Sequence, residues 1–178
     1  MINVTKSRIK KAIKETLTNK KDFAMIGLLV ATILFNLIAF KTNKRLSKNQ
    51  ILHIWTFTIS LQLIFDVMIE FKYWGYWYFD KEPNWQGLLA HIALVPPVNM
   101  MFLNWYPFKG DLIKRFSYIF FCVVAILLYE VIALLPEPWG YFNYGWWRLW
   151  HAAIVDPILL LLMVVFYKWI IRLEGELK

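Results

Sequence analysis

Residues 23–40, FAMIGLLVATILFNLIAF, form an apolar run of 18 residues without a charged side chain. A helix of roughly 20 apolar residues spans the hydrocarbon core of a bilayer, so this run predicts a transmembrane helix. Four further runs follow, at residues 51–70, 88–105, 116–135 and 152–171. None of them alternates as a β-barrel strand would. The sequence therefore predicts an all-α integral membrane bundle of five transmembrane helices.

The composition excludes an ordinary water-soluble domain. The chain is 60% hydrophobic and 18% charged, with a mean hydropathy of +0.48, whereas soluble domains have about 25% charged residues. A net charge of +8 in a soluble protein would indicate nucleic acid, but beside apolar runs it indicates anionic lipid. We therefore expect the lipid bilayer as a partner and no nucleic acid. The single cysteine, Cys122, excludes an intramolecular disulfide.

The chain divides into one domain with two short tails. Residues 1–22 are a basic tail whose apolar and lysine residues fall on different sides of a helix. Such a tail is either an amphipathic helix on an anionic leaflet or a solvated extension. No small-x-small cleavage site follows the first run, so we expect that run to be retained. Residues 23–172 are the predicted transmembrane domain, and residues 173–178 are a short C-terminal tail.

Basic residues do not decide the orientation of the bundle. Five spans place ten Lys and Arg residues on each side of the membrane, so the positive-inside rule gives a tie. Without the basic tail, the count is ten against three. That count favours a protein of the cell (cytoplasmic) membrane whose second and fourth loops are extracytoplasmic.

Polar groups inside the predicted spans lie at one depth. The second helix carries Asp66 and Glu70 near its end, four residues apart and so on one face. His91 begins the third helix, Glu130 precedes the end of the fourth, and Asp156 begins the fifth. Because neighbouring helices run antiparallel, all five groups lie toward the membrane face that carries the second and fourth loops. This coincidence is the strongest functional signal in the sequence.

Carboxylates within a membrane span cost at least roughly 2.5 kcal/mol each on insertion scales, so they usually face the bundle interior and have partners. Together with His91 they could bind a cation, share protons or hold a ligand. The structural alternative is that they pair with Arg148, His91 or tyrosine hydroxyls and fix the helix register. No cofactor is predicted, and a bound cation stays open.

The second and fourth loops hold seven of the ten Trp residues. An even aromatic belt would distribute these residues over both interfaces. The loops are therefore either interfacial hairpins or the mouth of a pocket that binds an organic cation, a sugar or a lipid headgroup. The candidate ligand-binding residues are Asp66, Glu70, His91, Asn99, Glu130, Asp156, Trp77, Trp139, Trp147 and Arg148.

Two adjacent prolines, Pro96 and Pro97, interrupt the third run. A proline within a helix leaves a carbonyl without its amide partner, and in lipid that carbonyl needs another donor. We expect a kinked helix buried in the bundle, with Asn99 as a donor beside neighbouring helices and water. The kink is either a static feature of the packing or a gating hinge.

The segments IFDVMIEFKYWGYWYFDKEP, LVPPVNMMFLNWYPFKG and LLYEVIALLPEPWGYF resemble a family of small multi-pass membrane proteins from Bacillus- and Clostridium-like Firmicutes that is described as uncharacterised. The resemblance covers about residues 60–170 and implies a membrane location with the aromatic loops outside. It implies no activity.

The expected function is the binding of a cation or a small ligand, cationic or lipid-derived, in an acidic pocket with an aromatic lid near one membrane face. One alternative is a structural or regulatory partner of another membrane protein, docked through the aromatic loops. Another is a small transporter that forms a homo-oligomer. No nucleophile triad, phosphate loop or HExxH motif is present. We therefore do not expect an enzyme, although an acid–base pair within the membrane leaves that class open.

Overall fold

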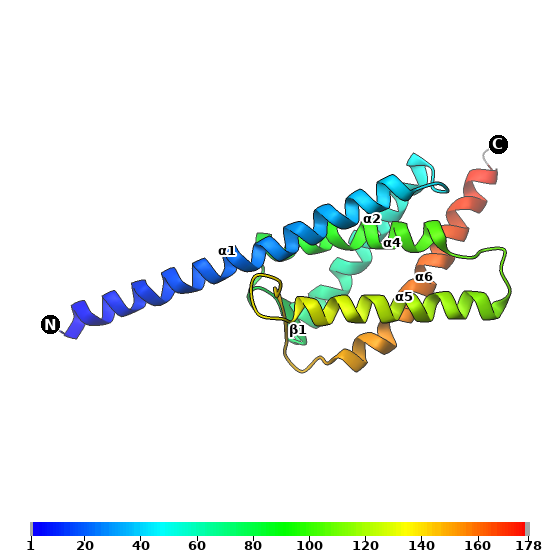
Figure 1. Ribbon diagram of the computed structural model, residues 1–178. Helices are drawn as coiled ribbons and strands as arrows, with labels where there is room; N and C mark the ends of the chain where they lie inside the picture. The colour runs from blue at the N-terminus through cyan, green and yellow to red at the C-terminus, as the bar shows by residue number, and fades with distance from the viewer. Residues whose placement is uncertain (1, 177–178) are drawn as a thin grey trace.

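The structure is a computed structural model that describes the backbone of residues 2–176 and the side chains of residues 22–176 (Figure 1). Its helices are α1 (Ile2–Thr42), α2 (Lys48–Asp66), α3 (Trp85–Leu89), α4 (Val95–Trp105), α5 (Leu112–Ala133) and α6 (Leu149–Glu176). Two short strands, β1 (Tyr76–Tyr78) and β2 (Phe142–Tyr144), lie in the aromatic loops, and two π-helical segments, Val67–Lys72 and Ala90–Leu94, extend α2 and join α3 to α4.

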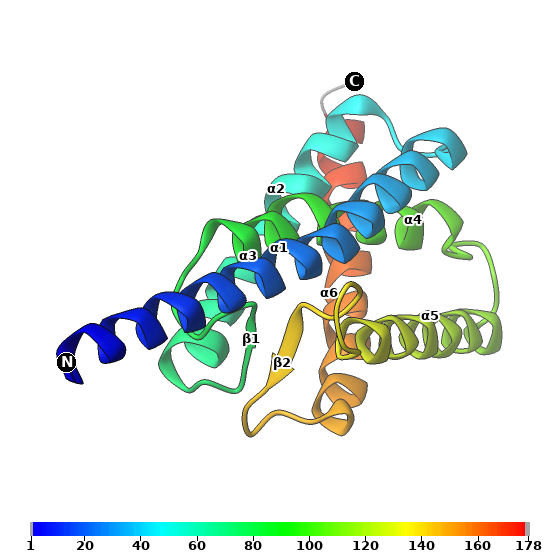
Figure 2. The ribbon, with the colours of Figure 1, turned by 60° about the vertical axis from the view of Figure 1, so that its left-hand side comes forward.

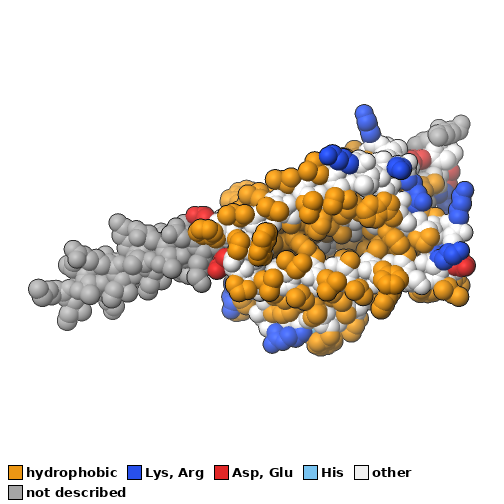
Figure 3. All heavy atoms as spheres, viewed as in Figure 1, with side chains coloured by type: hydrophobic (Ala, Val, Ile, Leu, Met, Phe, Trp, Pro, Cys, Tyr) orange, Lys and Arg blue, Asp and Glu red, His pale blue; other side chains and the backbone are white. Residues whose placement is uncertain are grey.

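Five helical segments of the described chain are long and apolar enough to cross a membrane, as the sequence predicted. They are Asp22–Thr42, Lys48–Lys72, Trp85–Trp105, Leu112–Ala133 and Leu149–Glu176. Apolar side chains cover the face seen in Figure 3, and Lys and Arg side chains gather toward its ends. The architecture is consistent with a multi-pass membrane protein.

The N-terminal tail continues α1 without a break, and its backbone projects beyond the bundle (Figure 1). It leaves the bundle on the side of the two strands, so its seven basic residues belong to the same side as the aromatic loops. The predicted separation of its apolar and basic faces lies outside the described side chains.

The helices form a core with one loosely packed member. The helices α1, α2 and α4 pack together, α6 packs against α2 and α4, and α5 packs mainly against α6. Figure 2 shows the same arrangement, with α5 set apart from α1 and α4. Fully buried residues such as Ile54, Met100, Leu103 and Met163 fill the contact between α2, α4 and α6.

Side chains from α1 and α2 satisfy the carbonyls that the proline pair leaves free. Pro96 and Pro97 have no amide hydrogen for the carbonyls four residues earlier, at Ile92 and Ala93. The Trp55 indole N–H donates to the Ile92 carbonyl at 3.0 Å, and the Asn36 amide donates to the Ala93 carbonyl at 2.8 Å. The expectation that Asn99 is a donor to these carbonyls is wrong. Its amide donates instead to the Thr58 hydroxyl at 3.0 Å, because Asn99 follows the prolines and faces α2.

The two aromatic loops pair with each other. Strand β1 is antiparallel to β2, with Tyr76 opposite Tyr144 and Tyr78 opposite Phe142. Side chains alternate across a strand, so Tyr76 and Tyr78 share one face and Trp77 lies on the other. Backbone hydrogen bonds from Gly145 and Trp147 to the Gly75 carbonyl, at 2.8 and 2.9 Å, extend the pairing. The sheet is a lid across one end of the bundle, where the sequence alone suggested two separate loops.

Candidate functional site

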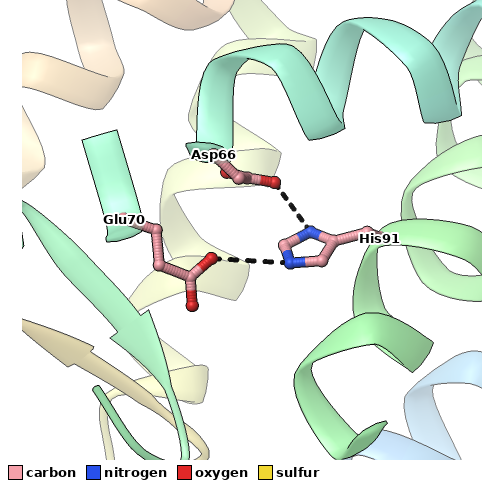
Figure 4. A group of neighbouring side chains, drawn as sticks. All are labelled: Asp66, Glu70 and His91. Carbon is pink, nitrogen blue, oxygen red and sulfur yellow. Dashed lines mark ion pairs between the residues drawn. The ribbon is translucent and has the colours of Figure 1, made fainter. Parts of the chain in front are cut away.

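Three of the predicted polar residues meet under the lid. Asp66 ends α2, Glu70 lies on the following π-helical segment, and His91 lies on the π-helical segment before α4. The ring of His91 sits between the carboxylates (Figure 4), with Nδ1 at 2.8 Å from Asp66 Oδ2 and Nε2 at 3.5 Å from Glu70 Oε2. The three residues are buried, with exposed fractions of 0%, 3% and 2%. We refer to Asp66, Glu70 and His91 as the triad.

Strand β1 holds the second oxygen of each carboxylate. The Tyr76 hydroxyl donates to Asp66 Oδ1 at 2.5 Å, and the Tyr78 backbone N–H donates to Glu70 Oε1 at 3.2 Å. The Tyr78 ring packs edge-on against the His91 ring, with 4.8 Å between centroids. Burial, and then the Asp66 carboxylate, raise the pKa of Tyr76 well above its usual value, so its hydroxyl keeps the proton that it donates.

Three buried atoms of the triad have no hydrogen-bond partner among the described residues: Asp66 Oδ2, Glu70 Oε2 and His91 Nδ1. Asp66 Oδ2 and His91 Nδ1 are close, but their geometry does not meet that of a hydrogen bond. One ligand atom from each residue lies within 4.8 Å of the others. Buried polar atoms are nearly always paired, so this group could hold a metal ion.

A cavity of about 460 Å³ lies beside the triad, within the bundle. Its wall is largely apolar and comes from α1, α2, α4, α5 and α6, with β1 and β2 at one end. Figure 3 shows a hollow in the apolar face. The hollow separates the surface over α1 and α4 from the surface over α5. The loose packing of α5 explains this opening, because the gap is bordered by Val98 and Met101 of α4 and by Cys122 and Ala125 of α5.

Two other predicted acids line this cavity near the lid. Glu130 accepts a hydrogen bond of 2.6 Å from the Tyr144 hydroxyl. Asp156 lines the same cavity, and its Oδ2 is buried without a hydrogen-bond partner among the described residues. Burial, and then the Glu130 carboxylate, raise the pKa of Tyr144, so this hydroxyl stays protonated as a donor.

The predicted residues therefore form two groups, where the sequence suggested one acidic pocket. The triad does not line the cavity, whereas Glu130, Asp156, Asn99 and Trp147 do. Tyr76 and Tyr78 line the cavity and also contact the triad, so they form the wall between the two groups. Residues that lie at one membrane depth on different helices need not line the same cavity. Here strand β1, which belongs to a loop, separates the two groups.

Three other candidates lie away from both groups. Trp77 is on the opposite face of β1 from Tyr76, and the Lys81 ammonium lies 4.7 Å from its ring. Trp139 is half exposed and passes close to Gly27 of α1. Arg148 donates to the backbone carbonyls of Gly145 and Trp147. Trp147 is buried and packs edge-on against Tyr76, with 5.5 Å between ring centroids.

Sequence reasoning considered tyrosine hydroxyls as partners of the acids but did not select them as site residues. Tyr76 and Tyr144 each donate to a carboxylate, and the hydroxyls of Tyr129 and Tyr141 lie 2.5 Å apart at the cavity wall. The signal was present in the sequences YWY at 76–78 and FNY at 142–144. Their alternation predicts short strands with one inward face.

Comparison of the chain with protein-family models, with curated proteins and with solved structures finds no match. The resemblance to a Firmicutes membrane family stays a prediction.

Proposed function

We propose that this protein is an integral membrane protein that binds an amphipathic molecule with a cationic head and a hydrocarbon tail. The observation that carries the proposal is the cavity of about 460 Å³, which is largely apolar and is lined at one end by Glu130 and Asp156. Ligand sites are typically concave and mostly apolar, with a few polar groups that fix the orientation of the ligand. The tail would fill the apolar part, and the head would lie at the carboxylates.

The exposed surface supports insertion into a bilayer. Large apolar side chains on α5 face outward, with exposed fractions of 64% for Phe116, 63% for Phe120 and 69% for Phe121. Exposed tryptophans mark both ends of the bundle, with Trp74 and Trp150 near the lid and Trp169 toward the other end. Tryptophan is enriched at membrane–water interfaces, so these residues favour a hydrocarbon layer between them.

The opening beside α5 supports entry from the lipid phase. In an inserted bundle this gap faces hydrocarbon, because the residues that flank it are apolar and the charged side chains lie toward the ends. A ligand with a long apolar tail partitions into the bilayer and can enter sideways. A small hydrophilic ion has no corresponding path through this opening.

The head-group end favours a cation. Two carboxylates that line one cavity repel each other when both are ionised, and a cation between them removes that cost. Aromatic rings of Tyr76, Tyr141 and Trp147 also line this end. A cation over an aromatic face gains about 2 kcal/mol or more when the site is desolvated, so a quaternary ammonium head fits the lining.

The test compares two probes with equal tails. Purified protein in neutral detergent micelles is titrated with dodecyltrimethylammonium or with 1-dodecanol, and the thermal unfolding temperature is followed. The ammonium probe should stabilise the wild type, and the uncharged alcohol should not. Two opposite unit charges about 5 Å apart attract by roughly 3 kcal/mol at an effective dielectric constant of about 20, so Asp156→Asn should weaken binding of the ammonium probe by roughly 100-fold.

The matched control is Glu82→Gln, which removes an exposed carboxylate from the aromatic loop on the same side of the bundle. It should respond to the ammonium probe as the wild type does. Equal responses to both probes, or an unchanged response in Asp156→Asn and Glu130→Gln, would contradict the proposal.

A further inference from the structure

The triad lies outside the cavity, so the proposed amphiphile site does not explain it. Two carboxylates and an imidazole are buried together at exposed fractions of 0%, 3% and 2%. Among the described side chains, the only basic group within ion-pair distance of Asp66 or Glu70 is His91 itself. Burying ionised carboxylates without compensation is costly, so the arrangement calls for a positive charge.

The hydrogen bonding of the triad is that of a ligand set. Each carboxylate has one oxygen held by β1, through the Tyr76 hydroxyl or the Tyr78 backbone N–H. The other oxygen of each, with His91 Nδ1, is buried and has no hydrogen-bond partner among the described residues. Outer partners that orient ligating groups in this way are a regular feature of metal sites. His91 Nδ1 and Asp66 Oδ2 face each other at 2.8 Å, and neither they nor Glu70 Oε2 has a hydrogen-bond partner elsewhere among the described residues. This observation is independent of the mere clustering of acids.

The backbone that carries Glu70 and His91 departs from regular α-helix. Glu70 and His91 both lie on π-helical segments, Val67–Lys72 and Ala90–Leu94. π-Helical segments are rare, and single-turn π-bulges within α-helices frequently lie at functional sites. Here they bring Glu70 Oε2 to 3.5 Å from His91 Nε2, and one ligand atom from each residue of the triad lies within 4.8 Å of the others.

We propose that Asp66, Glu70 and His91 bind one divalent first-row transition-metal ion. Two carboxylates and a neutral imidazole carry a charge of −2, which a divalent ion balances completely, whereas a proton on His91 would balance only half of it. An imidazole ligand favours zinc, copper, iron or nickel, whereas calcium, magnesium and manganese prefer oxygen ligands. The ion would join α2 to the segment before α4 beneath the lid, and it would stabilise the wall that Tyr76 and Tyr78 form beside the cavity.

The experiment measures metal in the full chain purified in detergent. The protein is treated with a chelator, reloaded with Co²⁺ or Zn²⁺, and washed, and its metal content is determined by mass spectrometry. The wild type should retain about one ion per chain, and bound Co²⁺ should show the visible ligand-field absorption of a low-coordinate site. Asp66→Asn and His91→Gln should retain less than about a tenth of that amount.

Two further variants separate ligation from folding. Glu130→Gln removes a carboxylate of the cavity and should retain the metal of the wild type. His91→Cys replaces the imidazole with a thiolate, a ligand that zinc and cobalt also bind, and with Co²⁺ it should give a sulfur-to-metal charge-transfer band that the wild type lacks. A wild type that retains no stoichiometric metal would overturn the proposal. So would Asp66→Asn and His91→Gln variants that retain as much metal as the wild type. Binding of dodecyltrimethylammonium is measured separately, so each proposal can fail alone.

Discussion

The carbonyl of Ala93 allows a quantitative test of how the triad is positioned. This carbonyl lies two residues after His91, and Pro97 supplies no amide hydrogen to it. The Asn36 amide on α1 replaces that donor, at 2.8 Å. Changing Asn36 to Leu keeps a side chain of similar size and removes the donor. We therefore expect Asn36→Leu to destabilise the bundle and to loosen the segment that carries His91.

Two magnitudes bear on the size of this effect. A buried acceptor left without a partner costs about 1–3 kcal/mol, but hydrogen bonds between membrane helices average only about 0.6 kcal/mol and reach about 1.7 kcal/mol. Asn36 also donates to the Thr32 carbonyl at 2.8 Å, so its loss affects two acceptors. We expect Asn36→Leu to lower the free energy of unfolding by about 1–2 kcal/mol.

A double-mutant cycle isolates the part of this loss in unfolding free energy that depends on Pro97. In Pro97→Ala the restored amide hydrogen can donate to the Ala93 carbonyl, so the Asn36 amide becomes partly redundant there. The cost of Asn36→Leu should then fall by about 0.5–1 kcal/mol, a coupling of the size found for residues in direct contact. Unfolding is followed by circular dichroism in mixed micelles with increasing sodium dodecyl sulfate. Equal costs of Asn36→Leu in both backgrounds would refute the reasoning.

Two other predictions concern the lid. A Cβ atom at Gly145 would lie 2.0 Å from the Trp74 carbonyl oxygen, whereas one at Gly175 would meet nothing within 4 Å. Thermal unfolding should therefore show a loss of about 1–3 kcal/mol for Gly145→Ala and none for Gly175→Ala, and equal effects would contradict the pairing of the loops. Burial, and then the Tyr129 hydroxyl, raise the pKa of Tyr141 above the value of about 10 in an unfolded chain. Stability from this group is fully present below pH 10 and is lost above it. Tyrosinate absorbance of Tyr141, obtained by difference from Tyr141→Phe, should therefore appear only with alkaline unfolding, and its appearance near pH 10 in folded protein would count against the buried position.

The spans were predictable because each is a continuous apolar run whose length matches a bilayer. The same reasoning located Asp66, Glu70 and His91 at one depth, since neighbouring helices run antiparallel. It did not distinguish residues that share a depth from residues that share a cavity. Glu130 lines the cavity and Asp66 does not, because the hydroxyl of Tyr76 intervenes, and its position depends on how a loop folds.

The pairing of β1 with β2 illustrates the same limit. The two strands are more than sixty residues apart, and no local pattern in either loop specifies the other as its partner. The donors to the proline-freed carbonyls are a second case. Asn99 follows the proline pair by only two residues, but Asn36 and Trp55 reach those carbonyls from other helices. Such contacts depend on which helices are neighbours, and that order is not encoded by periodicity.

The most direct test of the central proposal counts the amphiphiles that the cavity holds. Ala125 lines the cavity at the opening beside α5, so Ala125→Trp should block the opening without removing a charge. Native mass spectrometry of protein released from micelles with dodecyltrimethylammonium should show one bound probe on the wild type and none on Ala125→Trp or on the Glu130→Gln, Asp156→Asn double variant. Equal numbers of bound probes on all three proteins would contradict a specific site in the cavity.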